Sequence, residues 1–125
     1  MSLRTPLAKV RGLGSAKQGT EHWWQQRLTA IALVPLSLWF VSELLCMTGM
    51  DYAVVSQWLR VPVNAVLLIM LLVALFHHAQ LGIQVVIEDY IEPEWQKLAC
   101  IILVKFLAVL AGLTSVLSVA KVFLD

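Results

Sequence analysis

Apolar residues in this chain occur in three long, nearly uninterrupted runs instead of the short periodic patches of a soluble protein. The runs cover residues 28–47, 63–87 and 98–120, and the second has no charged residue between Arg60 and Glu88. A helix of roughly 20 residues crosses the hydrocarbon core of a bilayer, which is about 30 Å thick. Three strands could not close a barrel, and an open sheet edge leaves backbone groups unsatisfied in lipid. The pattern therefore predicts an all-α integral membrane protein with three transmembrane helices.

The composition supports the bilayer as solvent and excludes other classes of protein. Of the 125 residues, 60% are hydrophobic and 14% are charged, and the mean hydropathy is +0.83, whereas soluble chains have about 25% charged residues. A net charge of +1 lacks the basic excess that nucleic acid binding needs. Cys46 and Cys100 match neither a disulfide framework nor a metal-binding spacing, so we interpret both as small core hydrophobes.

The basic residues that flank the runs predict the orientation in the membrane. Before the first run lie Arg4, Lys9, Arg11, Lys17 and Arg27, whereas the two connections and the tail carry only Arg60, Lys97 and Lys121, one each. Because basic flanks favour the cytoplasmic side, the chain is expected to be N-in and C-out. Residues 1–27 would form a cytoplasmic basic arm and residues 28–125 the membrane anchor domain. This arm favours a bacterial cytoplasmic membrane, and a transit peptide for the mitochondrial inner membrane is the alternative.

Polar side chains gather in the second half of the second run, where burial in a membrane makes them candidates for function. Residues on a helix are spaced by 100°, so two faces are expected, rotated from each other by roughly 100°. One face holds, within about 60°, His78, Gly82, Val85 and Asp89, and the other holds His77, Gln84 and Glu88. An imidazole and a carboxylate therefore share a face.

The first face has the features of a haem site. An axial ligand needs an imidazole at mid-depth and a flat space beside it, which a glycine one turn later supplies. His78 followed by Gly82 meets both requirements, and Ala74 continues the stripe of small residues, whereas larger residues flank His77 at the same spacing. We therefore favour His78 as the ligand of a haem iron. In the alternative interpretation, the histidines only bond to a neighbouring helix and the small residues only permit close packing.

Other polar residues have two interpretations each. Asp89 and Tyr90 end the second run, where a carboxylate and a phenol could hold a quinone head group, although both residue types are also ordinary at a membrane interface. Arg27 could pair with a haem propionate or reach lipid phosphate. Lys105 and Glu43 can reach the interfaces in the same way. A stripe of small residues in the third run predicts a closely packed helix neighbour: Ala108, Ala111, Gly112 and Ser115.

Two stretches of the chain resemble a known family. The run HAQLGIQVVIEDY, from His78 to Tyr90, resembles the histidine, glycine and Asp-Tyr signature of the small hydrophobic membrane anchor subunit of succinate dehydrogenase, respiratory complex II. The stretch GSAKQGTEHWWQQRLTAIALVP, with its Arg27, Thr29 and Ala30, is similar to the segment before the first helix in alphaproteobacterial-like members. With the three-helix plan, the resemblance extends over nearly the whole chain.

The resemblance implies a role for each candidate residue. His78 would be one axial ligand of a haem b shared with a second three-helix cytochrome b anchor subunit, and Arg27 would lie near a haem propionate. Asp89 and Tyr90 would belong to the ubiquinone site. The anchor pair would dock the iron-sulfur and flavoprotein subunits, so that electrons from succinate reach the quinone. The family pattern assigns no firm role to His22 or His77.

Three other functions are compatible with the same pattern. In a small transporter or channel subunit, Glu43, His77 and Gln84 would line an ion path, although no paired repeat of the kind found in transporters is visible. A purely structural anchor would keep the fold without haem or quinone. A fumarate reductase anchor would use similar residues in the opposite direction of electron flow.

Overall fold

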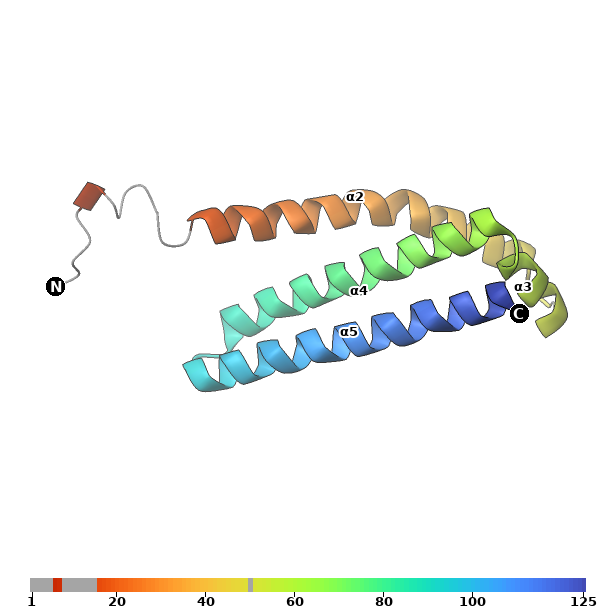
Figure 1. The fold of residues 1–125 in the computed structure, drawn as a ribbon. Coiled ribbons are helices and arrows are strands. Elements are labelled where there is room, and N and C mark those ends of the chain that lie inside the picture. Colours follow the sequence, from red (N-terminus) through yellow and green to blue (C-terminus); the bar gives the residue numbers. More distant parts are fainter. Residues whose placement is uncertain (1–5, 8–15, 50) are drawn as a thin grey trace.

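The computed structural model describes residues 6–7, 16–49 and 51–125, and every element in these ranges is a helix (Figure 1). The helices are α2 (Ala16–Cys46), α3 (Tyr52–Leu59), α4 (Pro62–Tyr90) and α5 (Glu94–Leu124). Helices α2, α4 and α5 are each long and apolar enough to cross a membrane, which confirms the prediction of three spans. Three of the arm's basic residues, Arg4, Lys9 and Arg11, lie outside the described residues.

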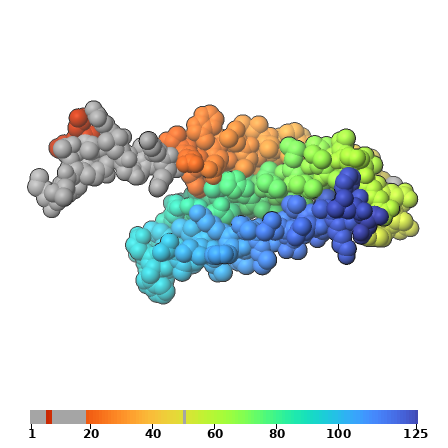
Figure 2. All heavy atoms as spheres, in the orientation of Figure 1, coloured from red at the N-terminus to blue at the C-terminus, as the bar shows by residue number. Residues whose placement is uncertain are grey.

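Helix α4 lies in the middle of the molecule, with α2 packed on one side of it and α5 on the other (Figures 1 and 2). Successive long helices run in opposite directions, so the start of α2, the end of α4 and the start of α5 share one end of the molecule. We call this the Tyr90 end. The short helix α3 packs against α4 and α5 at the opposite end, the α3 end, close to the C-terminus. Because α4 contacts every other helix, its two sides form two separate inter-helix surfaces.

Local sequence signals set the helix boundaries. Gly49 has a φ of +79° just after α2, a backbone conformation that glycine adopts without steric cost. Asp51 caps α3, its Oδ1 accepting a hydrogen bond from the backbone N–H of Val54 at 3.2 Å. Pro62 occupies the first turn of α4, where its missing N–H costs nothing. Pro93 disfavours helical geometry in the residue before it, which helps to end α4.

Two boundaries differ from the prediction. Helix α2 begins at Ala16, although the apolar run begins only at residue 28. The added part is polar, but glutamine, glutamate and lysine are good helix formers, so the helix continues beyond its apolar segment. The stretch from 52 to 59 was expected to be a plain connection, and it forms the amphipathic helix α3. Hydropathy alone marks spans, and it does not mark helices that continue or begin outside them.

Few side chains are buried within this chain. The buried hydrophobic residues in the described ranges are Leu36, Ala65, Leu71, Leu81, Ile87 and Val119, while most large apolar side chains are exposed. That surface is expected where lipid or another apolar chain replaces water. The small-residue stripe packs on α4 as predicted, since a Cβ added at Gly112 would lie 3.7 Å from the Phe76 ring. Both cysteines are free, but Cys46 is exposed, so its interpretation as a core residue is wrong.

Candidate functional site

His78 connects the two helices α2 and α4. Its ring is half-buried, and its Nδ1 lies 2.9 Å from the hydroxyl Oγ1 of Thr29 on α2. The same oxygen lies 2.8 Å from the backbone carbonyl of Gln25 and 3.0 Å from that of Gln26. His78 lies twelve positions before Tyr90, which puts it roughly 18 Å from the Tyr90 end along the helix. The imidazole is therefore fixed at a depth suited to a buried cofactor.

A groove of about 480 Å³ opens beside His78, between α2 and the second half of α4. It is lined by Gly19, His22, Trp23, Gln26, Arg27, Ala30, His78 and Val85. Two atoms in it, Nε2 of His22 and Oε1 of Gln26, are buried and have no hydrogen-bond partner in the part of the chain that the structure describes. Because buried polar atoms in proteins are nearly always paired, these two are expected to have a partner that the described residues do not provide.

Arg27 contributes a positive charge to this groove. Its guanidinium carbon lies 5.4 Å from the centre of the Trp23 ring, a cation–π contact. Within the described ranges the sole ion pair joins Lys97 and Glu94, so no carboxylate of those ranges neutralises Arg27. The groove thus combines a fixed imidazole, two unpaired polar atoms and a cation, which suits a ligand with an anionic group.

Gly82 lies where its small size matters, one turn beyond His78. A Cβ added there would lie 3.8 Å from Nε2 of Gln26, an ordinary van der Waals distance. Within this chain the space beside Gly82 is thus bordered by a flexible side chain from α2. The predicted clearance for a flat ligand stays a prediction.

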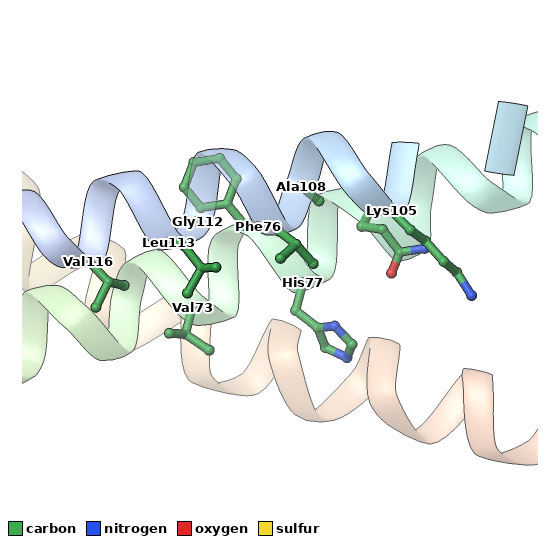
Figure 3. A pocket seen from close by; sticks show the side chains of 10 residues that line it. Val73, Phe76, His77, Lys105, Ala108, Gly112, Leu113 and Val116 are labelled. Carbon is green, nitrogen blue, oxygen red and sulfur yellow. The ribbon is translucent and has the colours of Figure 1, made fainter. Parts of the chain in front are cut away.

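His77 lies one position before His78 and is turned from it by about 100° around α4. It is exposed and lines a mostly apolar groove of about 450 Å³ between α4 and α5, together with Phe76, Lys105 and Gly112 (Figure 3). It also lines a groove of about 230 Å³ together with His22 and Gln25 of α2. It makes no hydrogen bond to any described residue. Nearby, the side chains of Gln80, Gln84 and Glu88 form a chain of two hydrogen bonds of 2.9 Å each along α4. These side chains satisfy one another's hydrogen-bonding groups along one helix, so their contacts need no ligand to explain them.

Asp89 and Tyr90 lie at the end of α4, apart from both grooves. Both side chains are exposed, Tyr90 at 81% of its surface. The structure therefore does not bring them into contact with His78. It places them at the same end as the start of α2, which carries His22 and Arg27.

The residues of the transporter interpretation are brought together only in part, since His77 and Gln84 line one groove of about 230 Å³ and Glu43 lies apart from them. Glu43 lies toward the α3 end, where its Oε2 accepts a hydrogen bond of 2.7 Å from the indole N–H of Trp58. Trp58 also stacks on Trp39, with ring centres 5.7 Å apart. Gln84 lies toward the opposite end of the molecule. These polar residues do not form one path through the described chain.

Three residues of α2 carry no assignment from sequence reasoning: His22 and Gln26, which line the groove, and Thr29, whose hydroxyl contacts His78. The face of α4 that these residues meet lies far along the chain, 49 positions away for the Thr29–His78 contact, and a single sequence does not reveal which helix faces pair. The one sequence signal that could have found Thr29 is its polarity within an apolar run, because a buried hydroxyl group needs a hydrogen-bond partner.

Comparisons with known proteins agree on one family. The family described as succinate dehydrogenase/fumarate reductase transmembrane subunit matches residues 1–112. The chain is similar to the succinate dehydrogenase hydrophobic membrane anchor subunit of Rickettsia bellii, with 37% identity over 116 residues, or 93% of each chain. The Rickettsia conorii protein of that name is 36% identical over 85% of each chain. The Paracoccus denitrificans protein of that name is 29% identical over 82% of this chain and 79% of its own.

Proposed function

We propose a haem-binding and quinone-binding role for this chain, which belongs to the family of succinate dehydrogenase/fumarate reductase transmembrane subunits and is a membrane anchor subunit of succinate dehydrogenase. The chain is a multi-pass membrane protein and is not catalytic itself. What needs an argument is which of its residues serve the complex.

The observation that carries the haem assignment is the groove beside His78. Two buried atoms of residues that line it, Nε2 of His22 and Oε1 of Gln26, have no hydrogen-bond partner among the described residues, which supports a polar ligand here. Arg27 in the same groove suits a carboxylate. An imidazole next to a polar, cationic groove fits a haem, whose iron takes a histidine and whose propionates take cations and hydrogen-bond donors.

In this proposal, His78 is one axial ligand of a haem b. Arg27 and His22 hold a propionate, and Gly82 leaves room for the macrocycle. One histidine cannot complete a six-coordinate site, so a second cytochrome b anchor subunit supplies the other ligand and covers the exposed side of α2 and α4. When bound, the haem supplies one-electron redox chemistry within the membrane.

The quinone site is proposed at the Tyr90 end. The phenol of Tyr90 donates a hydrogen bond to a carbonyl oxygen of ubiquinone, and the carboxyl group of Asp89 moves a proton to or from that oxygen. Both side chains are exposed and therefore available to a substrate. Because both residues lie at a helix end, a quinone bound there would be near the membrane surface, where protons are accessible.

The orientation follows from the same arrangement. We expect the Tyr90 end to face the cytoplasm, consistent with the basic residues before the first span and with a bacterial cytoplasmic membrane. The iron-sulfur subunit, which carries the flavoprotein subunit, then docks beside Asp89 and Tyr90. This leaves a short route for electrons from succinate to the quinone.

The experiment that tests the haem assignment compares two adjacent histidines in the whole complex. His78→Ala and His77→Ala complexes are purified in detergent, and haem per complex is measured. Loss of the imidazole ligand in His78→Ala should remove the haem or most of it. His77 lines the other groove, so His77→Ala should keep the wild-type amount.

Three results of this comparison contradict the proposal. A full haem content in His78→Ala excludes that residue as the ligand. A reversed result, with loss in His77→Ala alone, assigns the haem to the α4/α5 side. A wild-type complex without haem would leave the structural anchor as the function of this region.

A further inference from the structure

Thr29 is positioned to control which ring nitrogen of His78 carries the hydrogen. The Thr29 hydroxyl has a single proton, and its oxygen lies 2.8 Å and 3.0 Å from the backbone carbonyl oxygens of Gln25 and Gln26. Carbonyl oxygens only accept hydrogen bonds, so the proton points toward them. A lone pair of Oγ1 then faces Nδ1 of His78, which lies 2.9 Å away.

The direction of that hydrogen bond fixes the tautomer. An oxygen whose proton is already donated can only accept, so Nδ1 of His78 carries the hydrogen and donates it to Thr29. In a neutral imidazole the other nitrogen, Nε2, then carries the lone pair. A metal binds a neutral imidazole through that lone pair. In the opposite tautomer, Nδ1 would carry a lone pair that faces the lone pair of Oγ1. If the hydroxyl turned to donate to Nδ1 instead, the lone pairs of Oγ1 would face the two carbonyl oxygens. In either case Nε2 would carry the hydrogen and could not bind iron.

We propose that Thr29 is a positioning residue that holds His78 as the Nδ1–H tautomer, so that Nε2 is presented to the haem iron and the imidazole is made a more basic ligand. This inference rests on the proposed function, because it needs His78 to be the ligand. Hydrogen bonds from the remote nitrogen of a ligating histidine fix its ring orientation and raise its basicity. A more basic ligand stabilises ferric iron, and loss of the bond therefore raises the reduction potential.

The test uses two substitutions at Thr29 in the whole, purified complex. Thr29→Val keeps the shape and removes the hydroxyl, whereas Thr29→Ser keeps the hydroxyl. The measurements are the midpoint potential of the haem and its low-spin electron paramagnetic resonance spectrum, both of which report ligand basicity and orientation. Thr29→Val should shift the potential upward and change the spectrum, and Thr29→Ser should stay close to wild type.

Thr114 provides a matched control. Its hydroxyl also donates to a backbone carbonyl one turn back, that of Leu110 at 2.7 Å, but it is exposed on α5. Thr114→Val removes the same hydroxyl from a transmembrane helix without touching His78. Its potential and spectrum should equal those of the wild type.

Each outcome supports or overturns the inference. A Thr29→Val complex that keeps its haem with the wild-type potential and spectrum overturns it, as does equal haem loss in Thr29→Val and Thr29→Ser. Haem loss in Thr29→Val that Thr29→Ser restores supports it. If Thr29→Val does not assemble, Thr29→Ala is judged by the same criteria. If the His78→Ala complex keeps its haem, the proposed function itself fails. If the His78→Ala complex loses its haem but Thr29→Val leaves the haem content, potential and spectrum unchanged, only the role of Thr29 is refuted.

Discussion

His77 and His78 are neighbours in the sequence, yet they point in directions about 100° apart around α4 and have different surroundings. His78 is half-buried, bonded to Thr29, and beside a groove that contains unpaired polar atoms and Arg27. His77 is exposed and lines a mostly apolar groove against α5 (Figure 3), as well as a smaller groove that it shares with His22 and Gln25 of α2. A helix rotates by 100° per residue, so one step along the chain separates the position that we propose as a ligand from one with a different set of neighbours.

The difference shows what distinguishes a site from a polar residue in a membrane helix. Both histidines satisfy the general rule that intramembrane polar residues deserve a functional hypothesis. On the α2/α4 side, groups from two helices converge and leave hydrogen-bonding capacity unused. On the face of α4 that carries His77, Gln80, Gln84 and Glu88 satisfy one another along a single helix, and the two glutamines also line a groove with residues of α2. Polar atoms that lack a hydrogen-bond partner and are held in place by a second helix are the stronger evidence for a missing ligand.

The largest effect is expected from the end of α4, where Asp89 falls on the His78 side and Glu88 on the His77 side. Tyr90→Phe and Asp89→Asn should each lower quinone reduction by roughly a hundredfold, because a hydrogen-bond donor or a proton-transfer group is lost. Reduction of an artificial dye by the soluble subunits should persist. Glu88→Gln, which keeps a partner for Gln84, is the control and should stay near wild type. Equal losses in all three variants would contradict the two-sided account.

A smaller effect is expected from the two cations that face the two grooves. Arg27→Gln removes a charged partner of a propionate and should weaken haem retention by about tenfold in a detergent wash. Lys105→Gln removes a cation from the α4/α5 side and should leave haem retention unchanged. The measurement is haem per complex after increasing numbers of washes. Similar losses in both variants would indicate a general effect of membrane charge instead of a propionate contact.

The smallest effect is expected from two glycines. An added methyl group would lie 3.8 Å from Gln26 at Gly82 and 3.7 Å from Phe76 at Gly112, so this chain alone tolerates both changes. Gly82→Ala should lower haem content a few-fold if a macrocycle lies there. Gly112→Ala should keep the haem and raise thermal stability slightly, because alanine in a helix is favoured over glycine by about 1 kcal/mol. Haem content and melting temperature of the complex check both expectations.

The sequence was sufficient for the three spans and for the separation of His77 from His78. Apolar runs of membrane length and a fixed 100° rotation are local properties of the chain, and both are legible in it. The spacing of four positions between His78 and Gly82 also singled out a face of α4 on which His78 and Val85 line the groove.

The remaining features depend on helix pairing. Thr29 is 49 positions from His78, and no periodic signal states which face of α2 meets α4. Gln26 and His22 were missed for the same reason, since an unpaired buried atom exists only once both helices are in place. The start of α2 at Ala16 and the whole of α3 lie outside the apolar runs, where hydropathy does not predict helix boundaries.

The most direct test of the central claim, that the haem lies on the His78 side of α4, is the visible spectrum and midpoint potential of His78→Met and His77→Met complexes. Methionine still ligates iron, and it raises the potential relative to histidine. The account predicts that His78→Met retains haem with an altered spectrum and a raised potential, while His77→Met matches wild type. An unchanged spectrum and potential in His78→Met would contradict it.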